Sequence, residues 1–377
     1  MPDAIRVVIV DDSAMTRQML TQLLERDGAI KVVGTARDGR EAIRMVPELR
    51  PDVVTMDVHM PGMDGVTTTE HLMAYCPTPI LVLTASLARS EVDITFRMLG
   101  AGALEVIEKP HLGDVGAIER ARRDLVRRIK VLSRVKVVTH LRGRRKQEAP
   151  PAAPARLARP AQHAIANEAP HRLAQAIAAP DFPLVIIGAS TGGPRIVHRI
   201  LSDLPATLPA AIVIVQHIAD GFSGGLVDWL QSATTVPIAL ANEGRTLRAG
   251  EILVVPDQRD MLITTDGRVH LTQAPLLIQR PSIDVTMQAA AEVFGPRAIG
   301  VLLTGMGRDG AYGMLTINRR QGYTIAQNEQ TCAIFGMPRA AIQLGAANEI
   351  LPPEQISPRV VQLVQRLHAS APPVQLR

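Results

Sequence analysis

Three residues in the second half of the chain have the types that hydrolyse esters and amides. Ser190 lies in IIGASTGGPR, His217 follows the apolar run AIVIV, and Asp309 lies in the glycine-rich LLTGMGRDG. A serine hydroxyl needs a base to become a nucleophile, and the imidazole base needs a carboxylate to orient it. GASTG also satisfies G-x-S-x-G, in which small residues permit a sharp turn between a strand and a helix. The three residues predict a nucleophile, its base and the group that orients the base.

The same glycine-rich turn has a second interpretation, in which its backbone amides bind a phosphate. A dinucleotide site requires G-x-G-x-x-G and an acidic residue at the end of the next strand. Here Ser190 replaces the second glycine, and the next strand ends in Gln216. A P-loop requires Gly-Lys-Ser/Thr, whereas Pro194 and Arg195 occupy those positions. The nucleotide interpretations therefore fail on the residues present, although each triad candidate alone has the type of an ordinary cap or surface residue.

The first half of the chain has a group of polar residues that follow apolar runs. Asp11 and Asp12 follow the first run, Asp57 ends the third, Thr84 ends the fourth and Lys109 follows the fifth. Adjacent carboxylates repel one another unless a positive charge lies between them, and a hard cation with oxygen ligands, most plausibly Mg²⁺, supplies that charge. Single aspartates are usually caps or turn residues, but a set that converges with a hydroxyl and an amine predicts a metal and phosphoryl site.

The elements that must position these residues follow an alternating pattern. The apolar runs IRVVIV, KVVGTA, DVVTMD, PILVLT and ALEVIE alternate with helical segments near 14–26 and 39–47. This rhythm predicts an α/β fold with a parallel, doubly wound sheet, in which ligands gather at the carboxyl ends of the strands. The second half again has apolar runs that end in polar residues, so the sequence predicts two such domains. The order Ser, His, Asp differs from that of the α/β-hydrolases.

Charge and composition divide the chain further. Residues 1–112 carry 11 basic and 16 acidic side chains, residues 113–180 carry 15 and 5, and residues 181–377 carry 15 of each. The middle part predicts a basic amphipathic helix followed by a Pro/Ala-rich linker. We predict a first domain at 1–125, the helix and linker at 126–180, and a second domain at 181–370.

The same composition bears on partners and location. Only nine aromatic residues occur in the chain, so stacking on nucleobases is not expected, and we predict no nucleic-acid partner. No apolar run approaches the length of a membrane span, so no membrane insertion is expected. Two widely separated cysteines match neither a disulfide framework nor a zinc site, which favours reduced thiols and a cytoplasmic protein.

Residues 3–125 resemble the response-regulator receiver family through VVIVDDS, DVVTMDVHMPGMDG, LTA and EKP. The resemblance implies a flavodoxin-like fold with Asp57 as the phosphoacceptor. It implies Mg²⁺ binding by Asp11, Asp12, Asp57 and the backbone carbonyl of His59, and phosphoryl contacts from Thr84 and Lys109. Many receivers have an aromatic switch residue three positions before the lysine, but this chain has Val106 there. An aromatic flip is therefore not expected to be the output.

Residues 182–352 resemble the catalytic domain of the chemotaxis response-regulator protein-glutamate methylesterases. The motifs are IIGASTGGP, VQHIADGF, RPSIDV, LLTGMGRDGAYGM and TIAQNEQTCAIFGMP. The resemblance implies a Rossmann-like domain without a cofactor, with Ser190 as nucleophile, His217 as base, Asp309 as its orienter and the Met306 amide in the oxyanion hole. The segment ILVVPDQRDMLI departs from the family, which often has a glycine turn followed by a histidine there.

Together the resemblances imply a phosphorylation-activated serine esterase. Its implied substrates are glutamate γ-methyl esters, and specific glutamines, on the cytoplasmic helices of chemoreceptors, and its implied phosphodonor is a chemotaxis histidine kinase. We expect the unphosphorylated receiver to pack over the Ser190 crevice. Two alternatives remain at this point: a DNA-binding response regulator, which the size of the second domain disfavours, and a non-catalytic adaptor, in which the three triad residues would not meet.

Overall fold

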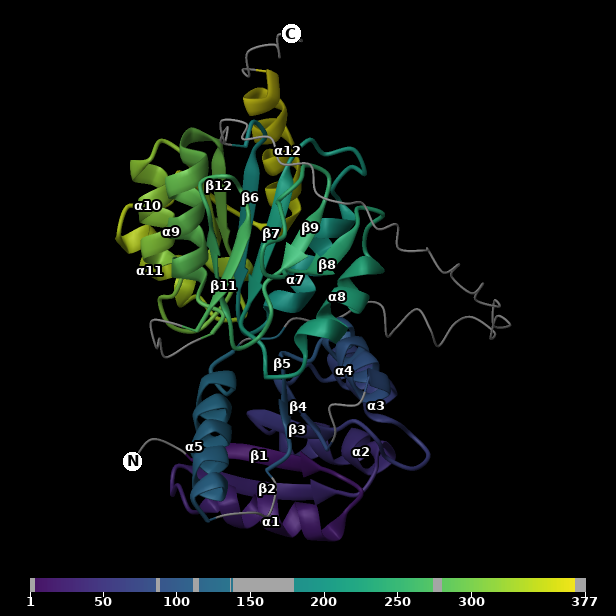
Figure 1. Cartoon of the computed structure of the whole chain (residues 1–377). Helices are drawn as coiled ribbons and strands as arrows, with labels where there is room; N and C mark the ends of the chain where they lie inside the picture. Colours follow the sequence, from purple (N-terminus) through teal and green to yellow (C-terminus); the bar gives the residue numbers. More distant parts are fainter. Residues whose placement is uncertain are drawn as a thin grey trace, which may run out of the picture.

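The computed structural model describes residues 4–85, 89–110, 115–135, 137, 180–273 and 280–369. These residues contain two parallel sheets, one in each half of the chain, and a separate antiparallel hairpin. Each sheet is covered by helices on both faces, and the two halves pack directly against each other (Figure 1). The structure thus confirms the predicted fold class of two α/β domains with parallel sheets.

The first sheet has five strands in the order β2-β1-β3-β4-β5. Helices α1 and α5 cover one face, and α2, α3 and α4 cover the other. The strands are β1 (Ile5–Val10), β2 (Ile30–Ala36), β3 (Val53–Asp57), β4 (Ile80–Thr84) and β5 (Glu105–Glu108). The helices are α1 (Ala14–Glu25), α2 (Gly39–Leu49), α3 (Gly65–Tyr75), α4 (Arg89–Ala101) and α5 (Val115–Leu132). All five strands fall on the apolar runs that predicted them.

Three of these helices begin at side-chain caps on the carboxyl side of the sheet. Ser13, Asp38 and Asp64 each accept a hydrogen bond from the backbone amide three residues further on, at 3.2, 2.9 and 2.8 Å. Such caps satisfy amides that the first turn of a helix leaves unpaired. The chain therefore turns at this edge through polar residues, which leaves Asp11 and Asp57 at the strand ends.

The second sheet has seven parallel strands in the order β14-β13-β12-β6-β7-β9-β8. Helices α9, α10 and α11 cover one face, and α7, α8 and α12 cover the other (Figure 1). The strands are β6 (Leu184–Ala189), β7 (Ala211–Gln216), β8 (Ile238–Leu240), β9 (Ile252–Val254), β12 (Ala298–Leu302), β13 (Tyr323–Gln327) and β14 (Glu349–Leu351), with the hairpin β10 (Asp260–Ile263) and β11 (Val269–Thr272) outside the sheet. The helices are α7 (Gly193–Ser202), α8 (Ser223–Gln231), α9 (Ile283–Phe294), α10 (Ala311–Arg319), α11 (Met337–Gln343) and α12 (Pro353–Ala369), with the short η1 (Gly295–Arg297) and η2 (Glu329–Thr331).

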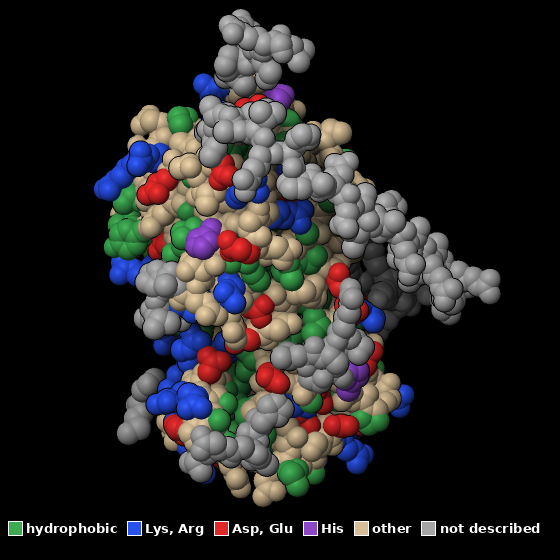
Figure 2. Space-filling view, in the orientation of Figure 1, with side chains coloured by type: hydrophobic (Ala, Val, Ile, Leu, Met, Phe, Trp, Pro, Cys, Tyr) green, Lys and Arg blue, Asp and Glu red, His purple; other side chains and the backbone are tan. Residues whose placement is uncertain are grey.

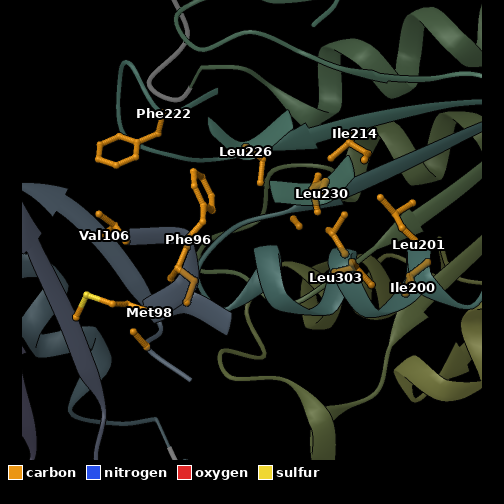
Figure 3. Packing of buried hydrophobic residues seen from close by; sticks show 14 of the residues in the cluster. Phe96, Met98, Val106, Ile200, Leu201, Ile214, Phe222, Leu226, Leu230 and Leu303 are labelled. Carbon is orange, nitrogen blue, oxygen red and sulfur yellow. The ribbon is translucent and has the colours of Figure 1, made fainter. Parts of the chain in front are cut away.

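A hydrophobic cluster continues from one half of the molecule into the other through α4 and α8. Phe96 of α4 stacks on Trp229 of α8 with ring centroids 5.6 Å apart, and meets Phe222 edge to face at 6.5 Å. Figure 3 shows Phe96 and Phe222 close together at this junction. A Cβ on Gly225 would lie only 3.0 Å from the Phe96 ring, so a glycine permits this close approach. The first half of the molecule is therefore held by apolar packing against the second half.

The basic helix is shorter than the sequence pattern predicted. The pattern extended over residues 119–147, but α5 ends at Leu132, and a turn at Ser133 and Arg134 follows it. Val135 beyond the turn is buried in the receiver core, which accounts for the change in chain direction. Lys and Arg side chains gather over α5 in Figure 2. Most of the predicted linker, residue 136 and residues 138–179, lies outside the described residues, and the boundary at residue 125 stays a prediction.

Candidate active site and acidic receiver site

The three triad candidates lie at the carboxyl ends of adjacent strands. Ser190 directly follows β6, His217 directly follows β7, and Asp309 lies in the turn between β12 and α10. Strand β6 is paired with β12 on one side and β7 on the other. The connections from these central strands run towards opposite edges of the sheet. In α/β proteins, ligands bind at the strand ends where the connections diverge in this way. The sheet topology thus brings all three residues to one edge.

Ser190 sits on a sharp turn that neighbouring backbone groups fix. Its amide donates to the Thr304 carbonyl at 3.0 Å, and the Gln216 side-chain amide donates to the Ser190 carbonyl at 3.0 Å. Gly192 has a φ of +75°, a left-handed conformation that favours glycine. A Cβ on Gly305 would lie 2.6 Å from the Ser190 Cβ. The glycines of GASTGG and LLTGMG therefore allow two strand ends to approach each other at the serine.

His217 is oriented by Asp309. The ring nitrogen Nε2 lies 2.8 Å from Asp309 Oδ2, and the imidazole is almost fully buried. A carboxylate accepts at this nitrogen, which places the proton of the neutral ring on Nε2 and leaves a lone pair on Nδ1. Nδ1 is buried and has no hydrogen-bond partner among the described residues. Nδ1 is therefore the nitrogen available to take a proton from Ser190, which lines the same cavity.

Asp309 is surrounded by hydrogen-bond donors at the N-terminus of α9. Its acceptor contacts are the amides of Ile283, Asp284 and Gly310 at 2.8, 3.0 and 3.0 Å and the Ser282 hydroxyl at 3.1 Å. Burial alone would raise the pKa of the Asp309 carboxyl, but the hydrogen bonds from His217 and the helix amides outweigh burial and lower that pKa below its usual value. Asp309 is thus a permanently charged carboxylate at neutral pH.

Two further acids, one half-buried and one fully buried, lie beside this network. Asp284 accepts a hydrogen bond from the Gly313 amide at 2.7 Å, and burial raises the pKa of its carboxyl to about 6. Asp260 of β10 is fully buried, and its Oδ1 accepts from the Ser282 amide at 2.7 Å. Burial is also the main cause that raises the pKa of Asp260. Neither acid was predicted as a site residue, although Asp260 lies in the segment ILVVPDQRDMLI that departs from the family pattern.

A cavity of about 480 Å³ opens beside Ser190 between the two halves of the molecule. The second half contributes residues that include Ser190, Thr191, His217, Arg280 and Met306 to its lining. The receiver contributes residues that include Phe96, Leu104, Glu105, Arg127 and Arg128. Met306 lines the same cavity as Ser190, and the role of its amide in the oxyanion hole stays a prediction.

The first half of the molecule makes polar contacts at the turn that carries Ser190. The Gly192 amide donates to the Leu104 carbonyl at 3.0 Å, and the Thr191 hydroxyl donates to Glu105 Oε2 at 3.3 Å. Glu105 also forms an ion pair with Arg128 of α5. These contacts join the start of β5 to the residues that follow Ser190. No local pattern in the sequence predicts these contacts, because they link positions 86 or more residues apart.

The receiver residues with predicted roles converge on one edge of the first sheet. Asp11, Asp12 and Asp57 offer carboxylate oxygens that lie within 4.8 Å of one another. Lys109 Nζ lies 2.7 Å from Asp11 Oδ2 and 2.8 Å from Asp57 Oδ1. Thr84 is buried at the end of β4, and its carbonyl accepts from the Lys109 amide at 2.7 Å. This acidic cluster is typical of a Mg²⁺ site, because its donors are hard oxygens.

Burial and charge compete at the same carboxylate. Burial raises the pKa of Asp57, and the nearby Lys109 ammonium lowers that pKa by less, so the net shift is upward. For Lys109, burial would lower the pKa of the ammonium, but the hydrogen bonds to Asp11 and Asp57 raise the net value. His59, the predicted carbonyl ligand, is exposed two residues after Asp57. One lysine cannot neutralise three carboxylates, so this cluster favours the binding of an additional cation.

The two sites define a class of protein in which a receiver domain is joined to an α/β domain with a serine, histidine and aspartate at its strand ends. Residues 7–116 match the family described as response regulator receiver domain, and residues 185–360 match CheB methylesterase. The chain is 41% identical over 361 residues to "Protein-glutamate methylesterase/protein-glutamine glutaminase 1" of Syntrophus aciditrophicus, covering 95% of this chain and 98% of that protein. It is 42% identical over 367 residues to the corresponding protein 2 of Anaeromyxobacter dehalogenans, covering 96% and 97%. The crystal structure of the Thermotoga maritima CheB methylesterase catalytic domain is 34% identical, with a TM-score of 0.47 and coverage of 48% of this chain and 99% of that chain.

The chain belongs to the family of CheB-type protein-glutamate methylesterases/protein-glutamine glutaminases, with an N-terminal receiver domain and a C-terminal methylesterase domain. Membership of this family excludes the alternative of a DNA-binding response regulator. Among the helices that the structure describes, none is long and apolar enough to span a membrane.

Proposed function

We propose that this chain hydrolyses protein glutamate γ-methyl esters through a covalent acyl-enzyme on Ser190. The family is that of protein-glutamate methylesterases/protein-glutamine glutaminases, so the activity is a hydrolysis of side-chain esters and amides. The observation that carries the residue assignment is the 2.8 Å contact between His217 Nε2 and Asp309, which leaves Nδ1 without a partner among the described residues in a histidine that lines the same cavity as Ser190. The arrangement favours an enzyme over a non-catalytic adaptor.

The proposed steps use the geometry of this site. His217 Nδ1 takes the proton as Ser190 Oγ attacks the ester carbonyl, and Asp309 stabilises the imidazolium that forms. The Met306 amide donates to the oxyanion of the tetrahedral intermediate. The imidazolium then returns its proton to the departing methoxide, which leaves as methanol. Water attacks the acyl-enzyme with His217 again as base and gives glutamate; for glutamine only the leaving group changes, to ammonia.

We further propose that Asp57 is the phosphoacceptor of the receiver. Asp11, Asp12, Asp57 and the carbonyl of His59 would hold Mg²⁺, which supplies charge neutralisation at the phosphoryl oxygens. Lys109 reaches Asp57 at 2.8 Å and is placed to contact a phosphoryl group on it, as is the Thr84 hydroxyl. Burial raises the pKa of Asp57, and a bound cation would act in the opposite direction by stabilising its charged form.

The receiver gates the active site in our proposal. Its α4 packs on α8, and Leu104 and Glu105 contact the residues that follow Ser190. Phosphorylation of Asp57 would weaken this packing and expose the crevice. The switch cannot use an aromatic side chain at position 106, because the residue there is a valine. Val106 is buried and lines the cavity.

The finer identity of the partners rests on the family. We propose chemoreceptor cytoplasmic helices as the methylated substrate, a chemotaxis histidine kinase as the phosphodonor, and adaptation in a chemotaxis-like pathway in the cytoplasm as the role. The proposed division is a receiver at 1–125, a basic helix and linker at 126–180, and a catalytic domain at 181–370, with α5 running across the first boundary.

A fluorophosphonate probe separates the enzyme from an adaptor. We expect covalent labelling of Ser190 in the phosphodonor-treated protein, located by peptide mass spectrometry. Ser202→Ala removes another serine of the same domain and is a matched control that should label normally. Labelling that persists in Ser190→Ala, or that is absent from the activated wild type, would contradict the assignment of the nucleophile.

A further inference from the structure

Arg280 is the fixed positive charge that the catalytic domain offers at its own crevice. Among the described residues that line the cavity beside Ser190, it is the one arginine or lysine that does not come from the receiver. Arg127 and Arg128 line the same cavity, but both belong to α5. When the receiver moves away, these two charges move with it. Arg280 remains beside the nucleophile.

A buried carboxylate lies beside Arg280 within ion-pair distance. Asp260 is fully buried, and its Oδ2 lies 3.7 Å from Arg280 Nε. Its Oδ1 accepts from the Ser282 amide at 2.7 Å, so Asp260 contacts both ends of the turn from Arg280 to Ser282. Arg280 Nη2 also donates to the Gln273 carbonyl. Burying a charge costs free energy unless a partner compensates it, so a buried ion pair adds little to stability by itself. We therefore assign this pair a role in fixing the position of the guanidinium.

The same turn supports the catalytic residues. The Ser282 hydroxyl donates to Asp309 Oδ1 at 3.1 Å, and Asp309 in turn holds His217 at 2.8 Å. Asp260 therefore contacts the turn that carries both Arg280 and Ser282. Through this one turn it positions the guanidinium and also the hydroxyl that donates to Asp309. A substrate group bound by Arg280 would have a defined position relative to Ser190.

The receiver places one carboxylate in this crevice, where Arg128 of the same domain forms an ion pair with it. In the covered state Glu105 reaches into the same cavity and accepts from the Thr191 hydroxyl at 3.3 Å. Its carboxylate therefore lies next to the nucleophile turn. A glutamyl ester is itself uncharged, so the cation at position 280 has no charge to bind on the scissile group. It can bind a carboxylate elsewhere on the substrate, and guanidinium groups bind carboxylates with two parallel hydrogen bonds.

We propose that Arg280 is a specificity-determining residue that binds an acidic side chain of the substrate protein within one helical turn of the scissile glutamyl ester, and that Asp260 is its positioning residue. This inference rests on the proposed function. The interaction contributes to substrate binding and not to the chemical step. Its loss should therefore raise KM and leave kcat nearly unchanged.

The test uses the phosphodonor-activated full-length protein and two soluble fragments of a receptor, each with one methyl-labelled glutamate. One fragment keeps acidic residues within a turn of that glutamate, and the other has alanines there. Hydrogen bonds between charged groups contribute roughly tenfold to hundredfold in binding. We expect Arg280→Gln to raise KM on the acidic fragment by about tenfold or more, with kcat within about twofold, and to change KM little on the alanine fragment.

Two further variants keep the test decisive. Arg280→Lys retains the charge without the planar fork and should recover part of the lost affinity. Asp260→Asn keeps an acceptor for the Ser282 amide but loses the charge that faces Arg280, so it should raise KM on the acidic fragment selectively. Equal losses on both fragments, or a loss in kcat with unchanged KM, would overturn the proposal. Absence of Ser190-dependent methanol release from both fragments would instead overturn the proposed function on which it rests.

Discussion

The two strand-end sites of this molecule shift the pKa of an aspartate carboxyl in opposite directions. In the receiver, three aspartates lie close together, two of them contact Lys109, and burial raises the pKa of Asp57 above its usual value. In the catalytic domain, hydrogen bonds from His217 and helix amides overcome burial and lower the pKa of Asp309. The first site therefore gains from added positive charge, which suits reversible phosphorylation. The second holds a permanent charge, which suits the orientation of a base through every catalytic cycle.

Removing the charge at Asp309 should have the largest effect. Asp309→Asn takes away the carboxylate that stabilises the imidazolium and fixes the proton on His217 Nε2, so we expect methanol release to fall about 10²–10⁴-fold. Asp284→Asn is the matched control, since Asp284 is a neighbouring half-buried acid whose amide, but not its side chain, contacts Asp309. It should stay within a few-fold of wild type. Equal losses in the two variants would mean that the carboxylate of Asp309 has no special role.

Removing the receiver should have the next largest effect. Deletion of residues 1–180 takes away α4, Leu104 and Glu105, which pack at the crevice. If the open form is a minor state, populated at about a tenth or less, basal methanol release without phosphodonor should rise about tenfold or more. A truncated protein no faster than the unphosphorylated whole would contradict the gate and leave the esterase assignment intact.

Much of the fold and the site could be predicted from local patterns. Continuous apolar runs predict buried parallel strands, and the topology then places Asp57, Ser190 and His217 at strand ends. The roles of Asp260 and Glu105 could not be predicted in this way. Each depends on a partner far away in the sequence, Ser282 for one and Thr191 for the other. No periodicity within either segment carries that information.

The end of α5 illustrates another limit. Arginines and lysines continue beyond Leu132 with a helical spacing, so the pattern predicts a longer helix. The structure instead turns at Ser133 and buries Val135 in the receiver core. Tertiary burial of one apolar residue decides the outcome there, and helix propensity is too weak to oppose it.

The smallest expected effect concerns stability at Asp284. Its carboxyl has a pKa of about 6 in the folded protein, above the ordinary 3.8, so the folded state binds the proton more tightly than the unfolded state. Stability from this group is therefore present below about pH 4 and is lost as the pH rises through about 6. One pKa unit is worth about 1.4 kcal/mol, which limits the loss to about 3 kcal/mol.

Asp284→Asn should remove that dependence. The amide oxygen can still accept from the Gly313 amide, so the variant should match wild type at pH 4 and have a higher urea midpoint at pH 8, with a gain of about 1–3 kcal/mol. Urea denaturation followed by circular dichroism at both pH values measures the difference. A gap of the same size at both pH values would show that ionisation of Asp284 is not the cause.

The most direct test of the central claim is methanol release from methyl-labelled receptor membranes, with and without acetyl phosphate and Mg²⁺. The intact protein is compared with Ser190→Ala. The account predicts release that requires Ser190 and rises when the phosphodonor is present, because phosphorylation of Asp57 exposes the triad. No release above the Ser190→Ala background, with receptors from the same organism, would contradict the assignment of this site as a phosphorylation-gated methylesterase.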